Sequence, residues 1–173
     1  EAEVVLRWAP GARYIRNGGR RILTSNKAPV MHLRYTRGLD FDAGEFAYHA
    51  AAMSFAHRFQ AFRGGNGTVM LHAGWNDRSL PRSRMRVYRS NYARSNFSDL
   101  QGAFNTMRYD EFAADMYAEA FVRLSPKLRW LHIGKRIQPQ LTLAMAAAWG
   151  HQHAAGAALH LPVQRAPQHI YLE

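Results

Sequence analysis

The sequence predicts a fold dominated by antiparallel β-strands, because apolar and polar residues alternate in several separate segments. The clearest alternation is VMLHAGW at residues 69–75, where the odd-numbered positions are all apolar and would share one face of a strand. VMHLRYTR at residues 30–37 alternates in the same way. No apolar run is long enough to cross a bilayer as a helix. The two faces of these strands must therefore meet two different environments.

The first part of the chain contains two strand candidates separated by a loop. The first strand, AEVVLRW, ends at Trp8, and the second is VMHLRYTR at residues 30–37. The arginine-rich and glycine-rich stretch between them contains Gly18 and Gly19, which can adopt positive φ angles. We therefore predict a loop at this place.

The next two strand candidates are joined by a hairpin signal. The long segment AYHAAAMSFAHRFQAF, residues 47–62, is followed by RGGNG at residues 63–67 and by the strand at residues 69–75. Asn and Gly tolerate the left-handed conformations that tight hairpin turns require. The two strands are therefore predicted to pair directly.

Residues 77–110 form a long basic, aromatic-rich loop with no sustained period. Most loops have about 4 to 6 residues, so a connection of this length is either functional or disordered. Tyrosine and phenylalanine recur along it, for example at Tyr88 and Phe104. This aromatic content predicts that the loop packs on another part of the protein.

Two alanine-rich segments, residues 111–124 and 137–150, are compatible with either strand or helix. Both alternate as strands do, but alanine, glutamate and methionine favour helix, and the first also carries a passable helical stripe. Asp115, Glu119 and Arg123 share one face in either structure. Such a set could handle protons, but it is more typical of a structural ladder of charges. Periodicity alone leaves both segments open.

The charge balance indicates a partner that carries phosphate, on either nucleic acid or lipid headgroups. Lys and Arg number 23 against 12 Asp and Glu, which gives a net charge of +11. The arginines between Arg78 and Arg94 could clamp single-stranded nucleic acid, contact lipid phosphates or form a solvated loop. The mean hydropathy of -0.38 suits a soluble domain as well as a transmembrane β-barrel, in which only alternate residues face lipid.

No catalytic or cofactor signature is found in the sequence. A phosphate-binding loop, a dinucleotide fingerprint and the common hydrolase and metalloprotease motifs are all missing, and the chain has no cysteine. Histidines in the alanine-rich and glycine-rich C-terminal stretch could bind a transition metal, but no third ligand lies at a recurrent spacing. We therefore expect a non-enzymatic protein without a metal or cofactor. The histidines concerned are His151, His153, His160 and His169.

Three segments resemble a family of outer-membrane β-barrel proteins of the Bacteroidota that has no known function. They are residues 3–39, residues 104–121, with the pattern FNTM followed by YDEF and D-x-Y, and residues 137–150 followed by IYLE. Members of that family usually carry an N-terminal carboxypeptidase-regulatory-like domain. The resemblance favours strands over helices in both alanine-rich segments.

The resemblance implies an all-β fold, namely an antiparallel transmembrane β-barrel segment. Residues 1–173 would form a single barrel portion, truncated at both ends, with about six or seven strands of a larger barrel. Tryptophans such as Trp8, Trp75 and Trp149 would lie near the membrane interfaces. The implied location is the outer membrane of a Gram-negative cell, with a role in transport, envelope assembly or surface attachment.

Two sets of residues are expected to matter in such a barrel. The expected lumen-facing polar residues are Arg34, Arg58, Asp115, Glu119 and Arg123. The expected contacts to lipopolysaccharide phosphate, or to a partner protein of the envelope, are Arg82, Arg84, Arg86 and Arg89. The alternative is a soluble, basic α+β domain that binds nucleic acid, in which the alanine-rich segments are helices.

Overall fold

The computed structural model describes most of the chain, and every regular element in the described part is a β-strand. The predicted all-β, antiparallel fold class is therefore confirmed. Among the described residues, no helix has the length and apolar character needed to cross a bilayer. The described residues are 2–25, 29–38, 47–61, 64–78, 85–88, 102–104, 113–126, 141–151 and 168–172.

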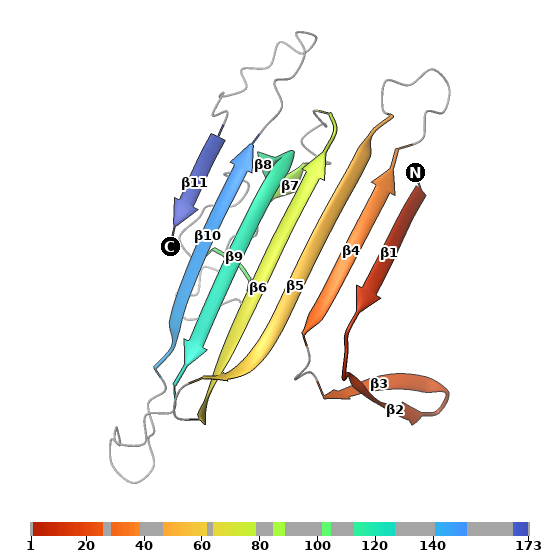
Figure 1. Cartoon of the computed structure of the whole chain (residues 1–173), viewed down its shortest axis with the longest axis vertical. Coiled ribbons are helices and arrows are strands. Elements are labelled where there is room, and N and C mark those ends of the chain that lie inside the picture. Colours follow the sequence, from red (N-terminus) through yellow and green to blue (C-terminus); the bar gives the residue numbers. More distant parts are fainter. Residues whose placement is uncertain are drawn as a thin grey trace.

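The main element is a seven-stranded antiparallel sheet in the order β1-β4-β5-β6-β9-β10-β11 (Figure 1). Apart from the excursions that contain β2–β3 and β7–β8, each strand pairs with the next one along the chain. The described sheet has open edges at β1 and β11. Its strands are β1 (Ala2–Trp8), β4 (Val30–Arg37), β5 (His49–Ala61), β6 (Gly65–Asn76), β9 (Met116–Ser125), β10 (Leu143–His151) and β11 (Gln168–Leu172).

The predicted hairpin of β5 and β6 is confirmed, with twelve residue pairs from Ala50↔Asn76 to Ala61↔Gly65. Gly64, at the turn, has a φ of 76°, a conformation that costs glycine little and other residues much more. Both alanine-rich segments are strands, because β9 pairs with β6 on one side and with β10 on the other. The hydrogen bonds of these two neighbours override the helical propensity of alanine.

Two small sheets lie outside the main one. The predicted loop after Trp8 instead contains a hairpin of β2 (Arg13–Asn17) and β3 (Arg20–Ser25). Its turn residues Gly18 and Gly19 have φ angles of 55° and 80°, as a tight two-residue hairpin requires. The second small sheet joins β7 (Arg86–Val87), from the long loop, to β8 (Ala113–Ala114).

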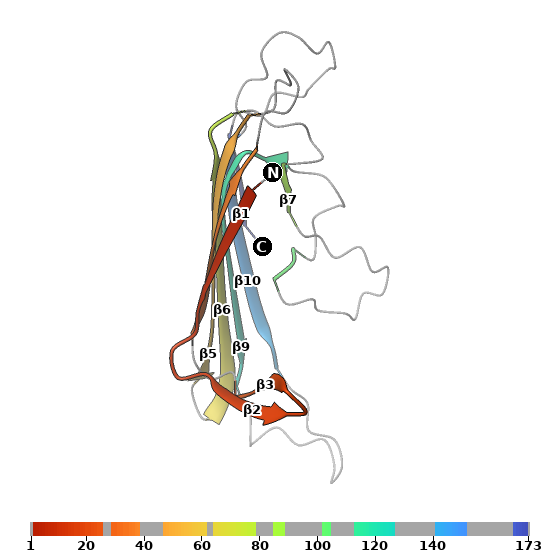
Figure 2. The same ribbon diagram turned by 90° about the vertical axis from the view of Figure 1, so that its right-hand side faces the viewer.

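The register gives the main sheet two distinct faces. We call inner the face with the even-numbered residues of β4, β5, β6 and β10 and the odd-numbered residues of β1 and β9. The outer face carries the alternate residues of the same strands. Seen edge-on, the sheet is a curved layer, and β7 lies to one side of it (Figure 2).

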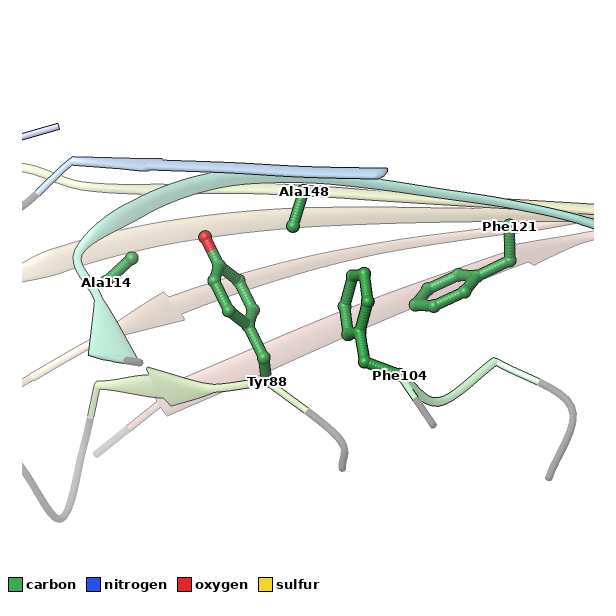
Figure 3. Close-up of a cluster of buried hydrophobic side chains, with 5 residues drawn as sticks. All are labelled: Tyr88, Phe104, Ala114, Phe121 and Ala148. Atoms are coloured by element: carbon green, nitrogen blue, oxygen red, sulfur yellow. The ribbon is translucent and has the colours of Figure 1, made fainter. Parts of the chain in front are cut away.

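The buried core of the described residues lies on the inner face. Tyr88 and Phe104, from the long loop, pack with Ala114 on Phe121 of β9 and Ala148 of β10 (Figure 3). The expectation that the aromatic loop packs on the protein is confirmed for these two residues. Other aromatic residues of the loop, among them Tyr92, Phe97 and Tyr109, lie outside the described residues.

Candidate functional site

The outer face of the sheet is a continuous apolar surface that is exposed to its surroundings. Large apolar side chains occupy it on β1, β4, β5, β6 and β10, each at least 37% exposed. Scattered exposed apolar residues are ordinary in soluble proteins, but a contiguous face of this kind indicates an interaction site or a membrane surface. The residues are Val4, Leu6, Trp8, Leu33, Tyr35, Met53, Phe59, Leu71, Trp75, Leu143, Met145 and Trp149.

Charge is nearly absent from the outer face. At the outer positions of β1, β4, β5, β6, β9 and β10, Arg37 is the sole Arg, Lys, Asp or Glu residue, and it is the last residue of β4. Each of these outer positions follows from the pairing register. The apolar surface therefore extends across these strands without an internal charge.

On the outer face of the β5–β6 hairpin, two aromatic side chains lie near opposite ends, whereas Phe55 lies at the middle of β5. On β6, Trp75 is near one end, and Phe59 of β5 pairs with Gly67 near the other. Gly67 and Trp75 are eight residues apart, which is about 27 Å at about 3.4 Å per residue. Strands of membrane β-barrels are tilted by about 35–45°, so this length corresponds to about 19–22 Å along the membrane normal and fits within an apolar band about 25 Å tall.

The inner face carries charged residues from several strands beside the buried apolar cluster. Four of the five residues predicted to face a lumen occupy inner positions, namely Arg34, Arg58, Glu119 and Arg123. Arg34 forms an exposed ion pair with Glu3, with Nε and Oε1 3.3 Å apart. The fifth, Asp115, precedes β9 and is fully buried, and its backbone N–H donates to the carbonyl oxygen of His151 at 3.0 Å.

Glu119 forms a two-point ion pair with Arg86 of the long loop. The guanidinium donates from Nε to Oε1 at 3.2 Å and from Nη2 to Oε2 at 3.0 Å, and the side chain of Glu119 is only 1% exposed. Burial opposes the charged form of Arg86, but the hydrogen bond and charge of Glu119 raise its pKa. The pair therefore fixes β7 to β9 by charge as well as by geometry.

The ring of Tyr117 on β9 lies next to both Arg86 and Gly74 of β6. The Arg86 guanidinium carbon lies 5.4 Å from the centroid of the Tyr117 ring, within the range of a cation–π contact. Tyr117 pairs across the strands with Gly74, and a Cβ atom on Gly74 would overlap the ring. Phe59 covers Gly67 in the same way on the outer face. Such aromatic cover over a strand glycine is a device for fixing register in curved sheets.

Tyr88 anchors the loop through a hydrogen bond and aromatic packing. Its hydroxyl donates to the carbonyl oxygen of Trp149 at 2.9 Å. The ring centroids of Tyr88 and Phe104 are 6.0 Å apart, and those of Phe104 and Phe121 are 4.9 Å apart. Burial, with a contribution from the Glu119 carboxylate, raises the pKa of Tyr88 above its ordinary value. The hydroxyl therefore remains a donor throughout the neutral range.

The four arginines predicted to contact phosphate fall into two groups. Arg86 is described, and its guanidinium is held by Glu119 on the inner face. Arg82, Arg84 and Arg89 lie outside the described residues. The phosphate contact stays a prediction for this set, and for Arg86 it would compete with a buried carboxylate.

No metal centre is found among the described residues. Within the described ranges, no group of three His, Asp or Glu side chains is arranged to hold a metal ion. Of the four C-terminal histidines, His153 and His160 lie outside those ranges, while His151 ends β10 and His169 belongs to β11.

The sequence pattern indicates several residues of the inner face but not which of them contact one another. Glu119 and Arg123 were predicted to share a face, but nothing in the spacing assigned Arg86 to Glu119. The cover of Gly74 by Tyr117 also depends on the pairing of β6 with β9, which joins residues that are 43 positions apart. Only the register of the sheet reveals these contacts.

Comparison with known protein families gives one match. The C-terminal domain of a family of unknown function, DUF5686, matches residues 1–127. We found no match among curated proteins or among solved structures. The match covers 127 of the 173 residues, from β1 through β9, and so includes both Arg86 and Glu119. The chain therefore belongs to the DUF5686 C-terminal domain family.

Proposed function

We propose that this chain is part of a transmembrane β-barrel in the outer membrane of a Gram-negative cell. The observation that carries the proposal is the contrast between the two faces of one sheet. The outer face exposes large apolar residues, and Arg37 is its one charged position on β1, β4, β5, β6, β9 and β10. The inner face carries charged residues on β1, β4, β5 and β9 and is partly covered by the loop.

The apolar outer face fits lipid better than it fits a second protein layer. A soluble sheet with one apolar face normally buries it under other elements. Here the described part of the long loop packs on the opposite, inner face instead. Lipid-facing and lumen-facing residues alternate in membrane barrels, as these residues do.

The proposal requires that further strands close the sheet. Backbone groups in hydrocarbon must all be paired, so the edges at β1 and β11 need partners within the membrane. The smallest bacterial barrels have about eight strands. In the proposal, the seven strands are a portion of a larger barrel.

The proposed role is non-enzymatic and lies in transport, envelope assembly or surface attachment. The cluster around Arg86 and Glu119 supports a role for the loop inside the barrel, where it would narrow the lumen. A Bacteroidota origin and a preceding carboxypeptidase-regulatory-like domain belong to the same proposal. Contact with lipopolysaccharide phosphate would involve Arg82, Arg84 and Arg89.

The experiment that tests the proposal is fractionation of the whole protein after expression in a Gram-negative host. We expect recovery in the outer-membrane fraction, extraction only with detergent, and a β-dominated circular dichroism spectrum. Recovery as a soluble monomer would contradict the proposal. If that monomer bound RNA or DNA with an affinity falling steeply with salt, the nucleic-acid alternative would stand without its predicted helices.

A further inference from the structure

A groove of about 450 Å³ lies on the apolar outer face. Its side walls include Tyr35 of β4 and Trp75 of β6, with Ala51 of β5 paired to both of them across the strands. In the neighbouring row, Met53 of β5 pairs with Ala73 of β6. The small side chains of Ala51 and Ala73 therefore leave a hollow among large apolar neighbours.

The groove has the volume of a small-molecule binding site, and its lining is mostly apolar. Its volume falls within the range of about 300–1,000 Å³ that is typical of small-molecule pockets. Apart from Arg34 the lining residues are apolar, aromatic or glycine, and the remaining walls come from Val4, Leu6 and Leu33. An apolar group is the occupant that such a lining favours.

Polar groups gather beyond the Tyr35 end of the groove. The Tyr35 hydroxyl lies 2.6 Å from Nδ1 of His49, which is the cross-strand partner of Arg37. Arg37 is exposed and lies two residues beyond Tyr35 on the same face, about 7 Å along the strand. An arginine at such a place can extend toward headgroups and bind a phosphate through two N–H donors.

We propose that this groove binds one acyl chain of an anionic phospholipid, with Arg37 holding its phosphate. The inference rests on the proposed function, since it places the outer face in lipid. The groove would hold a single acyl chain, and the one arginine beside it, Arg37, would bind a single phosphate. Lipopolysaccharide, with several chains and more than one phosphate on its lipid anchor, would need a broader set of both.

Native mass spectrometry of the detergent-extracted protein with added phosphatidylglycerol or phosphatidylethanolamine tests the inference. The wild type should retain phosphatidylglycerol about fivefold more than phosphatidylethanolamine, the ratio expected for one arginine near an anionic headgroup. Arg37→Gln should remove this preference and keep the retention of phosphatidylethanolamine. Ala51→Leu with Ala73→Leu should fill the hollow and remove the retention of both lipids.

The matched control is Ala120→Leu, which makes the same exchange on the outer face of β9, away from the groove lining. It should retain both lipids as the wild type does. Equal retention by the groove-filled variant and the wild type would overturn the inference, as would an equal loss in the control. A wild type that enters the membrane but retains neither lipid would overturn the inference alone. A wild type that stays out of the membrane would overturn the proposed function as well.

Discussion

At the scale of single residues, the ion pair of Arg86 and Glu119 is the contact that most directly joins the loop to the sheet. Both groups lose water on folding, and each satisfies the other through two hydrogen bonds. Removing one partner leaves a charge in a place where water solvates it poorly. The pair should therefore behave as a coupled unit rather than as two independent charges.

A double-mutant cycle tests this coupling. Glu119→Gln and Arg86→Met should each destabilise the protein in lipid vesicles by about 2 kcal/mol, in the range found for hydrogen bonds to charged groups. The double variant should lose less than the sum, with a coupling energy of about 1–3 kcal/mol. Urea unfolding followed by tryptophan fluorescence measures all four proteins. Additive effects would show that the two side chains act separately.

Gly74 and Tyr117 form the second residue-scale contact with a clear consequence. Gly74→Ala should destabilise the protein by about 1–3 kcal/mol, because the added methyl group overlaps the Tyr117 ring. In a Tyr117→Ala background the same exchange should be neutral or stabilising, since alanine is normally better than glycine in a strand. The same urea assay measures both. A constant cost in the two backgrounds would contradict the contact.

At the scale of the elements, the sequence predicts most strands, because alternation is a local signal. Residues 30–37 and 69–75 can be recognised from their own side chains. The alanine-rich strands β9 and β10 are decided by neighbouring strands, and their local sequence favours helix as much as strand. The hydrogen bond from the Tyr88 hydroxyl to the carbonyl oxygen of Trp149 joins residues 61 positions apart, which no local pattern encodes.

Weakening the aromatic anchor should release the loop without unfolding the sheet. Tyr88→Ala together with Phe104→Ala removes two buried rings and the hydrogen bond to Trp149. Hydrogen exchange should then accelerate by at least about tenfold at residues 85–88, since local opening follows the loss of buried contacts. The β5–β6 hairpin should exchange as in the wild type.

The control for this experiment is Tyr35→Ala, which removes a ring from the outer face. It should leave the exchange of residues 85–88 unchanged. Unchanged exchange in the double variant would show that the loop is held by other contacts. Faster exchange throughout the β5–β6 hairpin would show that the loop and the sheet unfold as one unit.

At the scale of the whole molecule, one curved sheet has an apolar outer face and an inner face that carries charged residues and a packed loop. The alternation in the sequence indicates that each strand has two different faces. The pairing register is needed to show which faces of neighbouring strands lie on the same side of the sheet. The arrangement then aligns the apolar residues of β1, β4, β5, β6 and β10 on one side, and the loop covers part of the other. The chain has a net charge of +11, but Arg37 is the one Arg, Lys, Asp or Glu residue at the outer positions of β1, β4, β5, β6, β9 and β10.

The central claim is that the outer face meets lipid. Because the chain has no cysteine, single cysteines can be introduced one by one at residues 69–75 of β6 and spin-labelled. In lipid vesicles, labels at odd positions should show high accessibility to oxygen, which concentrates in hydrocarbon, and labels at even positions should show low accessibility. A period of two is the predicted result. Equal accessibility at all positions, or preferential contact of the odd positions with a water-soluble nickel reagent, would contradict the account.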